Sequence, residues 1–380
     1  MVSTLLVYLA GHIKQKGFAK FLIIISVFVP CYLAAVRDST IGTDMQEYGE
    51  HLFQICKGTS YFEIIDNAYQ EPLFILVASI CSNFFNRYVY YFVLQVLVIA
   101  PIMSTVLYYG KKKAWMGMLV YYLWFYGYTL NLMRQSIAIA LIIYGVRYIF
   151  ENKKNKYFLC IVIACGFHLS AILGLLIYAI YFVIIYEAPA QIETVEDTAR
   201  YKKRFSKAFN NFKYRYNVVF RICCLGVMVI SVFLGSMIIQ GVSLITGRFG
   251  YQVTHLQSSY TFNTRYFVAL VVIIFMINYR AKKNNIITSE LYQLFIMLVS
   301  CGMILFQLMG ISFQMYRVSL YFTCFFVVLI PMVFCGKKRM INTLTFWCIA
   351  GIMLYLFYGS VVLHGWNGIY PYTSVYLGIR

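Results

Sequence analysis

The stretch YVYYFVLQVLVIAPIMSTVLYYGKKK (residues 88–113) decides the fold class of this chain. Residues 88–109 contain no charged side chain and are long enough to cross a bilayer as a helix, which takes about 20 apolar residues. Three consecutive lysines, Lys111–Lys113, follow directly. Because positive residues beside a span stay in the cytoplasm, this break marks the inner end of a membrane-spanning helix.

Similar apolar runs recur along all 380 residues. The chain is 62% hydrophobic and only 12% charged, and its mean hydropathy is +0.73. These values predict an all-α polytopic membrane protein, with residues 1–380 forming a single integral-membrane domain. The formal net charge of +19 does not predict a nucleic-acid partner, because the lysines flank the apolar runs and are typical of orientation in the lipid bilayer.

Lysine placement predicts which side of the membrane each break faces. Apart from Lys57, the lysines fall in basic breaks that we assign to the cytoplasm, around residues 14–20, 111–113, 153–156, 202–213, 282–283 and 337–338. The alternate breaks then face outward. They include two outer loops, residues 37–71 and 242–265, whereas residues 187–217 form the largest polar cytoplasmic segment.

The alternation of inner and outer breaks along the chain then predicts about 11 transmembrane helices (10–12). Residues 72–85 are too short to cross and are predicted to form a re-entrant or interfacial outer helix. Residues 157–186 are predicted to cross twice, turning outside at Gly166–Ser170. The expected spans are residues 21–36, 88–109, 114–131, 134–150, two within 157–186, 218–241, 266–279, 291–311, 318–334 and 343–362, with residues 2–13 as a candidate twelfth.

Arginines are more frequent in the predicted outer breaks than topology requires. Arg37 and Asp44 flank Gly42 in the first outer loop, where they are either a solvated ion pair or a phosphate contact with a general base. Arg134, followed by Gln135, opens a returning span, where it either snorkels to the lipid headgroups or binds an anionic group with its planar guanidinium. Further arginines lie at the same predicted level, namely Arg248, Arg265 and Arg317, the last next to Tyr316.

His168 lies at the predicted outer turn of residues 157–186, and it is either a satisfied core histidine or a group that exchanges a proton with a hydroxyl. Arginines gathered on one face favour a phosphate or diphosphate ligand. The eleven cysteines lie mostly in apolar runs and show no zinc spacing, and phosphate-binding glycine loops are absent from the sequence. No metal site and no disulfide framework are therefore expected.

Several of these elements occur in an order that resembles the EpsG family, a branch of the Wzy-like polysaccharide polymerases. The resemblance covers most of the chain. It rests on Arg37 with Gly42-Thr43-Asp44 and Tyr48, on Gln70-Glu71-Pro72, on Arg134-Gln135-Ser136, on His168-Leu169-Ser170 and on Tyr316-Arg317.

The resemblance implies a fold similar to the membrane-embedded GT-C class and an active site on the outer face of the bacterial cytoplasmic membrane. It also implies glycosyl transfer between undecaprenyl-diphosphate-linked oligosaccharides, with a chain-length regulator as a further partner. By similarity to the O-antigen ligases, no metal or cofactor is expected.

The same resemblance implies residue roles. Arg134 and Arg317 are the leading ligands of the diphosphate, with Arg265 and Arg37 next. Asp44 is the first choice for the general base and His168 the second, and Glu71 is expected to hold an arginine in place.

Two other functions fit an outer cluster of arginines. A flippase for lipid-linked glycans would need charged residues that serve both faces, and the sequence shows few within its spans. A membrane O-acyltransferase would use His168 on an acyl donor, but a cytoplasmic thioester donor requires an inward-facing histidine. We expect a polymerase in preference to either.

Overall fold

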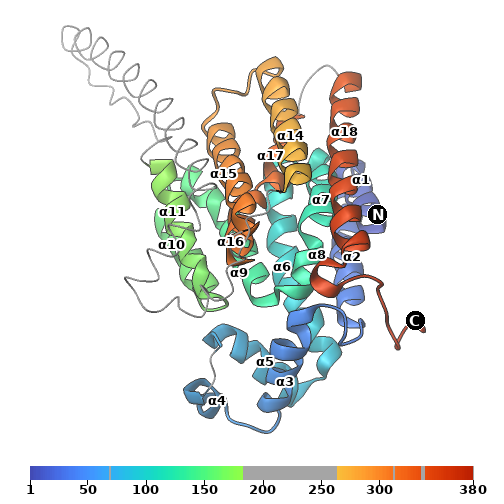
Figure 1. Ribbon diagram of the computed structural model, residues 1–380, viewed down its shortest axis with the longest axis vertical. Coiled ribbons are helices and arrows are strands. Elements are labelled where there is room, and N and C mark those ends of the chain that lie inside the picture. Colours follow the sequence, from blue (N-terminus) through green and yellow to red (C-terminus); the bar gives the residue numbers. More distant parts are fainter. Residues whose placement is uncertain (68–69, 183–262, 311–312, 335–338, 380) are drawn as a thin grey trace, which may run out of the picture. The chain divides into compact units, whose positions relative to one another are not determined.

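The computed structural model describes residues 1–67, 70–182, 263–310, 313–334 and 339–379 (Figure 1). Over these residues the chain is helical, and an isolated bridge between Ser374 and Ile379 is its sole β pairing. The chain divides into two compact units: unit 1 is Met1–Leu175 with Val268–Ile287 and Cys324–Arg380, and unit 2 is Leu176–Phe267 with Thr288–Thr323. The predicted all-α class is confirmed, and a single membrane domain stays a prediction.

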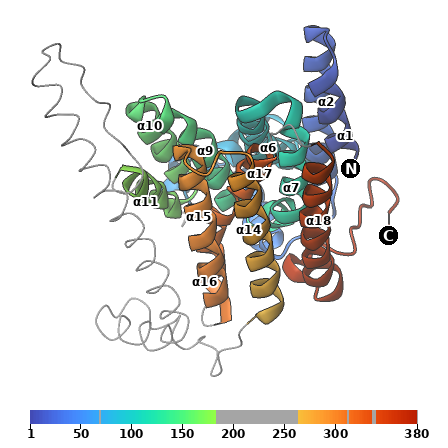
Figure 2. The ribbon, with the colours of Figure 1, turned by 90° about the horizontal axis from the view of Figure 1, so that it is seen from above.

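Unit 1 contains most of the described helices (Figures 1 and 2). They are α1 (Val2–His12), α2 (Lys16–Ala35), α3 (His51–Cys56), α4 (Tyr61–Asn67), α5 (Pro72–Phe84), α6 (Arg87–Gly110), α7 (Ala114–Trp124), α8 (Tyr126–Asn131), α9 (Met133–Phe150), α10 (Lys154–Cys165), α17 (Phe326–Val333) and α18 (Arg339–Phe357). Helices α11 (Leu173–Ile180) and α14 (Thr264–Lys283) each contribute residues to both units. Short π-helical or 3₁₀ segments cover Met45–Glu50, Lys111–Lys113, Leu169–Ile172, Tyr358–Leu363 and Trp366–Gly368.

Seven helical stretches of the described chain are long and apolar enough to cross a membrane. They are Lys16–Ala35, Arg87–Trp124, Met133–Phe150, Thr264–Lys283, Glu290–Gln307, Met315–Val333 and Met340–Leu363. These stretches confirm a polytopic membrane protein. The expected total of about 11 counts Arg87–Trp124 as two spans, residues 157–186 as two more, and residues 218–241. Residues 218–241 lie outside the described residues, together with the predicted cytoplasmic segment 187–217 and most of the loop 242–265.

The stretch at residues 88–113 folds as its sequence predicts. Helix α6 has 24 residues and is about 36 Å long at 1.5 Å per residue, enough to cross a hydrocarbon core of about 30 Å. The three lysines form a 3₁₀ turn, and α7 leaves it in a new direction. The next predicted span, 114–131, is divided at Phe125 into α7 and α8, where Tyr126 bonds across to the Pro30 carbonyl.

The short helix predicted at residues 72–85 and the break predicted within residues 157–186 are both present, whereas two membrane crossings by the second run stay a prediction. Helix α5 has 13 residues and is too short to cross, and Pro72 opens it at a position where a missing N–H costs nothing. The run 157–186 breaks after α10, with an extended His168 and a 3₁₀ turn before α11. The membrane side that each helix end faces stays a prediction.

The core of unit 1 is packed tightly around α7 and α17. A Cβ on Gly117 of α7 would lie 2.6 Å from the Val327 carbonyl oxygen of α17, so these two backbones approach more closely than a side chain allows. Val327–Ile330 are almost fully buried. The closely packed helices α7 and α17 therefore form a rigid support for the helices around them.

The C-terminal tail folds back onto the first loop after α2. The Asp38 N–H donates to the Thr373 carbonyl, the Gly42 N–H donates to the Gly368 carbonyl, and the Ser374 hydroxyl donates to the Val36 carbonyl. Gly42 has a φ of +94°, and a Cβ there would lie 2.6 Å from the Leu130 carbonyl oxygen. Glycine is therefore required both for the backbone conformation and for the contact with α8.

Unit 2 is described mainly by a helical hairpin, α15 (Glu290–Gln307) and α16 (Phe313–Thr323). A Cβ on Gly302 would lie 2.7 Å from the Thr323 methyl group, so the two helices pack closely. Near the turn between them, Phe306 stacks on Tyr266 and meets the edge of Tyr316.

Candidate active site

Arg134 is the centre of the best-defined polar cluster in unit 1. Its Nη1 lies 2.7 Å from Oε2 of Glu71, and its guanidinium lies over the rings of Tyr48 and Phe74, 5.0 and 5.8 Å from their centroids. The Arg134 and Glu71 side chains are 21% and 18% exposed. The pair is thus partly withdrawn from solvent, and one part of the guanidinium stays accessible to a ligand.

Glu71 also ties the start of α5 to the turn that carries His168. Its second oxygen, Oε1, accepts a hydrogen bond of 3.2 Å from the Leu169 N–H, and the Leu73 N–H donates to the Gly166 carbonyl at 2.8 Å. One carboxylate therefore positions both Arg134 and the Gly166–Ser170 turn. This agrees with the expectation that Glu71 holds an arginine.

The hydrogen bonds of His168 define its tautomer. Its Nδ1 accepts from the Ser170 N–H at 3.3 Å and lies 2.7 Å from the Ser170 hydroxyl. Since a backbone N–H can only donate, Nδ1 is the acceptor, and the proton of the neutral ring is on Nε2. In this arrangement His168 presents a hydrogen-bond donor, which suits an oxygen that gains negative charge better than a hydroxyl that loses a proton.

Asp44 is held in place by Asn131, at the end of α8. The Asn131 Oδ1 accepts from the Asp44 N–H at 2.7 Å and from the Thr43 hydroxyl at 3.0 Å. Asn131 is 3% exposed. Asp44 and Tyr48 are about one helical turn apart, and Tyr48 lies against Arg134, so Asp44 belongs to the same neighbourhood.

We expect Asn131→Ala to lower activity about 10²-fold, because displacement of a reacting group by about 1 Å has that effect. Asn131→Asp keeps the acceptor oxygen and should retain more activity than Asn131→Ala. The measurement is polymer formed per unit of enzyme in purified membranes.

The matched control is Asn83→Ala. Asn83 holds a different segment, through the Gly58 N–H and the Cys56 carbonyl. Equal losses in Asn83→Ala and Asn131→Ala would contradict a specific role for Asn131 in positioning Asp44.

Arg37 is buried and used inside the protein. It is 2% exposed, its Nη1 and Nη2 donate to the Ala34 and Leu130 carbonyls at 2.9 Å, and its Nε contacts the Met45 sulfur. Burial lowers the pKa of this guanidinium from its ordinary value, and the neighbouring Tyr91 opposes that shift. These contacts favour a role in joining α2 to α8 over direct contact with a ligand, and the predicted ligand role is untested.

The other predicted residues are distributed as follows. Gln135 is buried beside Arg134 in α9. Arg265 opens α14 in unit 2, next to Tyr266, and Tyr316 and Arg317 lie in α16 of the same unit. Phe306 contacts both Tyr266 and Tyr316, which are the sequence neighbours of Arg265 and Arg317. Arg248 lies outside the described residues.

Two residues that the sequence did not single out take part in this region. Asn131 precedes Arg134 in the sequence, and a polar residue ahead of a span was its only signal. Arg87 opens α6 and lies 3.7 Å from Oε2 of Glu50, but on the sequence it resembles an ordinary residue flanking a span. Among the described residues, no group of three His, Cys, Asp or Glu side chains is arranged to hold a metal.

Comparison with known proteins identifies a family model that matches part of the chain. No curated protein and no solved structure matches the chain. The model of the EpsG family matches residues 20–189, a stretch that contains Arg37, Asp44, Glu71, Arg134 and His168. The resemblance to the EpsG family, a family of Wzy-like polysaccharide polymerase and exopolysaccharide biosynthesis proteins, is thus confirmed over residues 20–189.

Proposed function

We propose that this protein is a polysaccharide polymerase that joins oligosaccharide repeats carried on undecaprenyl diphosphate, at the outer face of a bacterial cytoplasmic membrane. The observation that carries the proposal is the Arg134–Glu71–Tyr48 cluster, an oriented guanidinium at the end of a membrane-spanning helix within the stretch that matches the EpsG model. A planar cation in a partly dry setting suits a diphosphate.

The reaction that we propose is an inverting glycosyl transfer. A hydroxyl at the non-reducing end of the acceptor attacks the anomeric carbon of the donor, forming a new C–O bond. The bond from that carbon to the diphosphate oxygen breaks, and the lipid diphosphate leaves with the bonding electrons. The acceptor's proton passes to a base.

The residues of unit 1 suit these steps. Arg134 stabilises the charge that grows on the leaving diphosphate, and it does so without reorganising because Glu71 already holds it. His168, with its proton on Nε2, donates a hydrogen bond to an oxygen of the same group. Asp44 takes the proton from the acceptor hydroxyl.

The first test is polymer formation by the purified protein in proteoliposomes supplied with lipid-linked repeats from outside. We expect a ladder of polymer sizes that depends on the protein. Repeats that cross the membrane without being joined would support a transporter and overturn the proposal.

The second test is the side of the membrane. Leu169→Cys places a thiol on a side chain that is 68% exposed, one residue from His168, and Lys112→Cys is the control on the predicted inner turn. An impermeant maleimide added to whole spheroplasts should label Leu169→Cys above the wild-type background and leave Lys112→Cys unlabelled. The reverse pattern would place the cluster in the cytoplasm and exclude the proposed reaction.

A further inference from the structure

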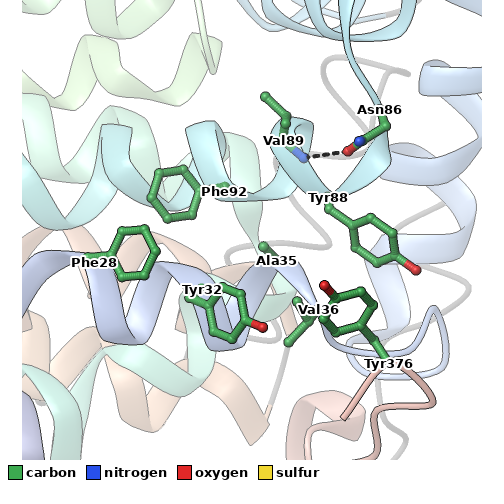
Figure 3. A pocket seen from close by; sticks show the side chains of 9 residues that line it. All are labelled: Phe28, Tyr32, Ala35, Val36, Asn86, Tyr88, Val89, Phe92 and Tyr376. Atoms are coloured by element: carbon green, nitrogen blue, oxygen red, sulfur yellow. Dashed lines mark hydrogen bonds between the residues drawn. The ribbon is translucent and has the colours of Figure 1, made fainter.

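An aromatic groove lies between the facing ends of α2 and α6 and the C-terminal tail. Its volume is about 320 Å³. It is lined by Phe28, Tyr32, Ala35, Val36, Asn86, Tyr88, Val89, Phe92 and Tyr376. Figure 3 shows Phe28 and Phe92 at one end and Tyr88, Tyr376 and Asn86 at the other. The groove is therefore apolar at the end deeper in the helices and carries polar atoms at the end near the loop.

Arg87 stands beside the polar end of this groove. Its guanidinium lies 5.7 Å from the centroid of the Tyr88 ring, and Tyr88 in turn meets Tyr376 at 5.4 Å. The Nε and Nη2 atoms of Arg87 are shielded from solvent, and no atom of the described chain accepts a hydrogen bond from them. These two nitrogens form one edge of the guanidinium, the edge that binds two oxygens of a phosphate at once.

Glu50 neutralises Arg87 without a hydrogen bond to that edge. Its Oε2 lies 3.7 Å from Arg87 Nε, which is too long for a hydrogen bond, and it accepts from the Tyr91 hydroxyl at 3.2 Å. Gln54 donates to the other oxygen of Glu50 at 3.1 Å. A shielded donor that makes no hydrogen bond is unfavourable, so the Nε and Nη2 atoms of Arg87 are a sign of a ligand.

The shape of the groove selects a hydrocarbon chain over a sugar. A sugar ring needs several hydrogen-bond partners, whereas the wall beyond Tyr32 consists of apolar and aromatic side chains. The Asn86 side chain is already engaged at the start of α6, where it accepts from the Val89 N–H at 3.0 Å. The fitting ligand is an amphiphile, with its chain against Phe28 and Phe92 and an anionic head at Arg87.

Arg87 and Arg134 lie against the same short helical segment. Arg134 lies over Tyr48 and Arg87 pairs with Glu50, and both partners belong to the segment Met45–Glu50, which Asp44 precedes. Two cationic sites thus flank the segment that follows the proposed base. This inference rests on the proposed function, which binds two lipid-linked glycans in each reaction: a donor, whose lipid diphosphate leaves, and an acceptor, which keeps its own.

We propose that the aromatic groove and Arg87 form the site of the second lipid, in which the acceptor's polyprenyl chain lies between α2 and α6 and its diphosphate binds Arg87. The donor's diphosphate then binds Arg134. The acceptor's sugar extends from Arg87 toward Asp44, where its hydroxyl loses a proton.

A binding experiment tests this site without requiring polymerisation. The probe is a photoactivatable polyprenyl phosphate that carries no sugar, added to the full-length protein in nanodiscs of neutral lipid. Illumination should label peptides that contain Tyr32, Tyr88 or Tyr376. Arg87→Gln, which removes the charge, and Val89→Trp, which fills the groove, should each lower labelling about tenfold or more.

Matched variants control for general effects on the membrane helices. Phe21 and Phe28 both lie on α2 and are 53% and 50% exposed, but only Phe28 lines the groove. Phe28→Ala should lower labelling and Phe21→Ala should not. Equal labelling of wild type, Arg87→Gln and Val89→Trp would overturn the proposal, and so would complete competition by phosphatidylglycerol at equal concentration, which would mark an ordinary anionic-lipid site.

A kinetic experiment separates failure of this inference from failure of the proposed function. The labelled acceptor carries carbon in place of its anomeric oxygen, so it cannot act as a donor. Arg87→Gln should raise the acceptor concentration for half-maximal rate about tenfold and leave the saturating rate unchanged. A wild-type protein that forms no polymer contradicts the proposed function, whereas an active Arg87→Gln with unchanged acceptor dependence contradicts the acceptor site alone.

Discussion

Arg134→Ala is expected to abolish polymer formation while the protein still accumulates in the membrane. Loss of one preoriented donor to a developing anion lowers a rate by about 10²–10³-fold. The fold should survive, because Glu71 still accepts from the Leu169 N–H and the backbone bond between Leu73 and Gly166 is untouched. Polymer is measured on gels of cell-surface glycan, and protein by immunoblot of the same membranes.

Arg134→Lys provides the sharper version of this experiment. Lysine keeps the positive charge but lacks the planar guanidinium, which can bind Glu71 and a phosphate at the same time. Arg134→Lys should therefore also abolish polymer formation. Arg147→Ala is the matched control: Arg147 lies near the other end of α9, where it stacks on Tyr144 and bonds to Tyr148. Polymer of normal length from Arg134→Ala would remove Arg134 from the active site.

The elements that the sequence predicted correctly are those set by local patterns. The lysine turn after α6, the shortness of α5 and the break at Gly166–Ser170 follow from charge, length and a polar interruption in an apolar run. The start of α9 at Met133, one residue from the predicted Arg134, follows from the polar residues that open the span. Each signal lies within a few residues of the feature that it predicts.

Long-range contacts explain what the sequence did not reveal. Arg37 has the same sequence signature as Arg134, an arginine at a predicted outer break. Only the fold shows that carbonyls from α2 and α8 surround Arg37, whereas Arg134 is paired with a carboxylate and keeps an accessible part. Asn131 and Arg87 were overlooked for the same reason, since their partners, Asp44 and Glu50, are distant in the sequence.

The EpsG match covers only some of the predicted site residues. The matched stretch, residues 20–189, holds Asp44, Glu71, Arg134 and His168. Tyr316 and Arg317 lie beyond it, in unit 2. Sequence order alone associates them with the unit 1 cluster, and Arg317→Ala in the polymer assay tests that association directly.

Asp44→Asn is expected to lower the rate of polymer formation by about 10²–10⁴-fold, the usual contribution of a general base. The substitution keeps the size of the side chain and removes its capacity to take a proton. The loop should stay in place, because Asn131 holds it through the Asp44 backbone N–H and the Thr43 hydroxyl. The measurement is the initial rate at saturating lipid-linked repeats, with the purified variant in proteoliposomes.

Two further variants decide between Asp44 and His168 as the base. His168→Ala should lower the rate less than Asp44→Asn, since His168 Nδ1 already accepts from Ser170 and its other nitrogen carries the ring proton. Asp66→Asn, an exposed acid on α4, is the matched control and should keep the wild-type rate. If Asp44→Asn keeps the wild-type rate and His168→Ala does not, the proton passes to the histidine, and its ring must change tautomer when substrate binds.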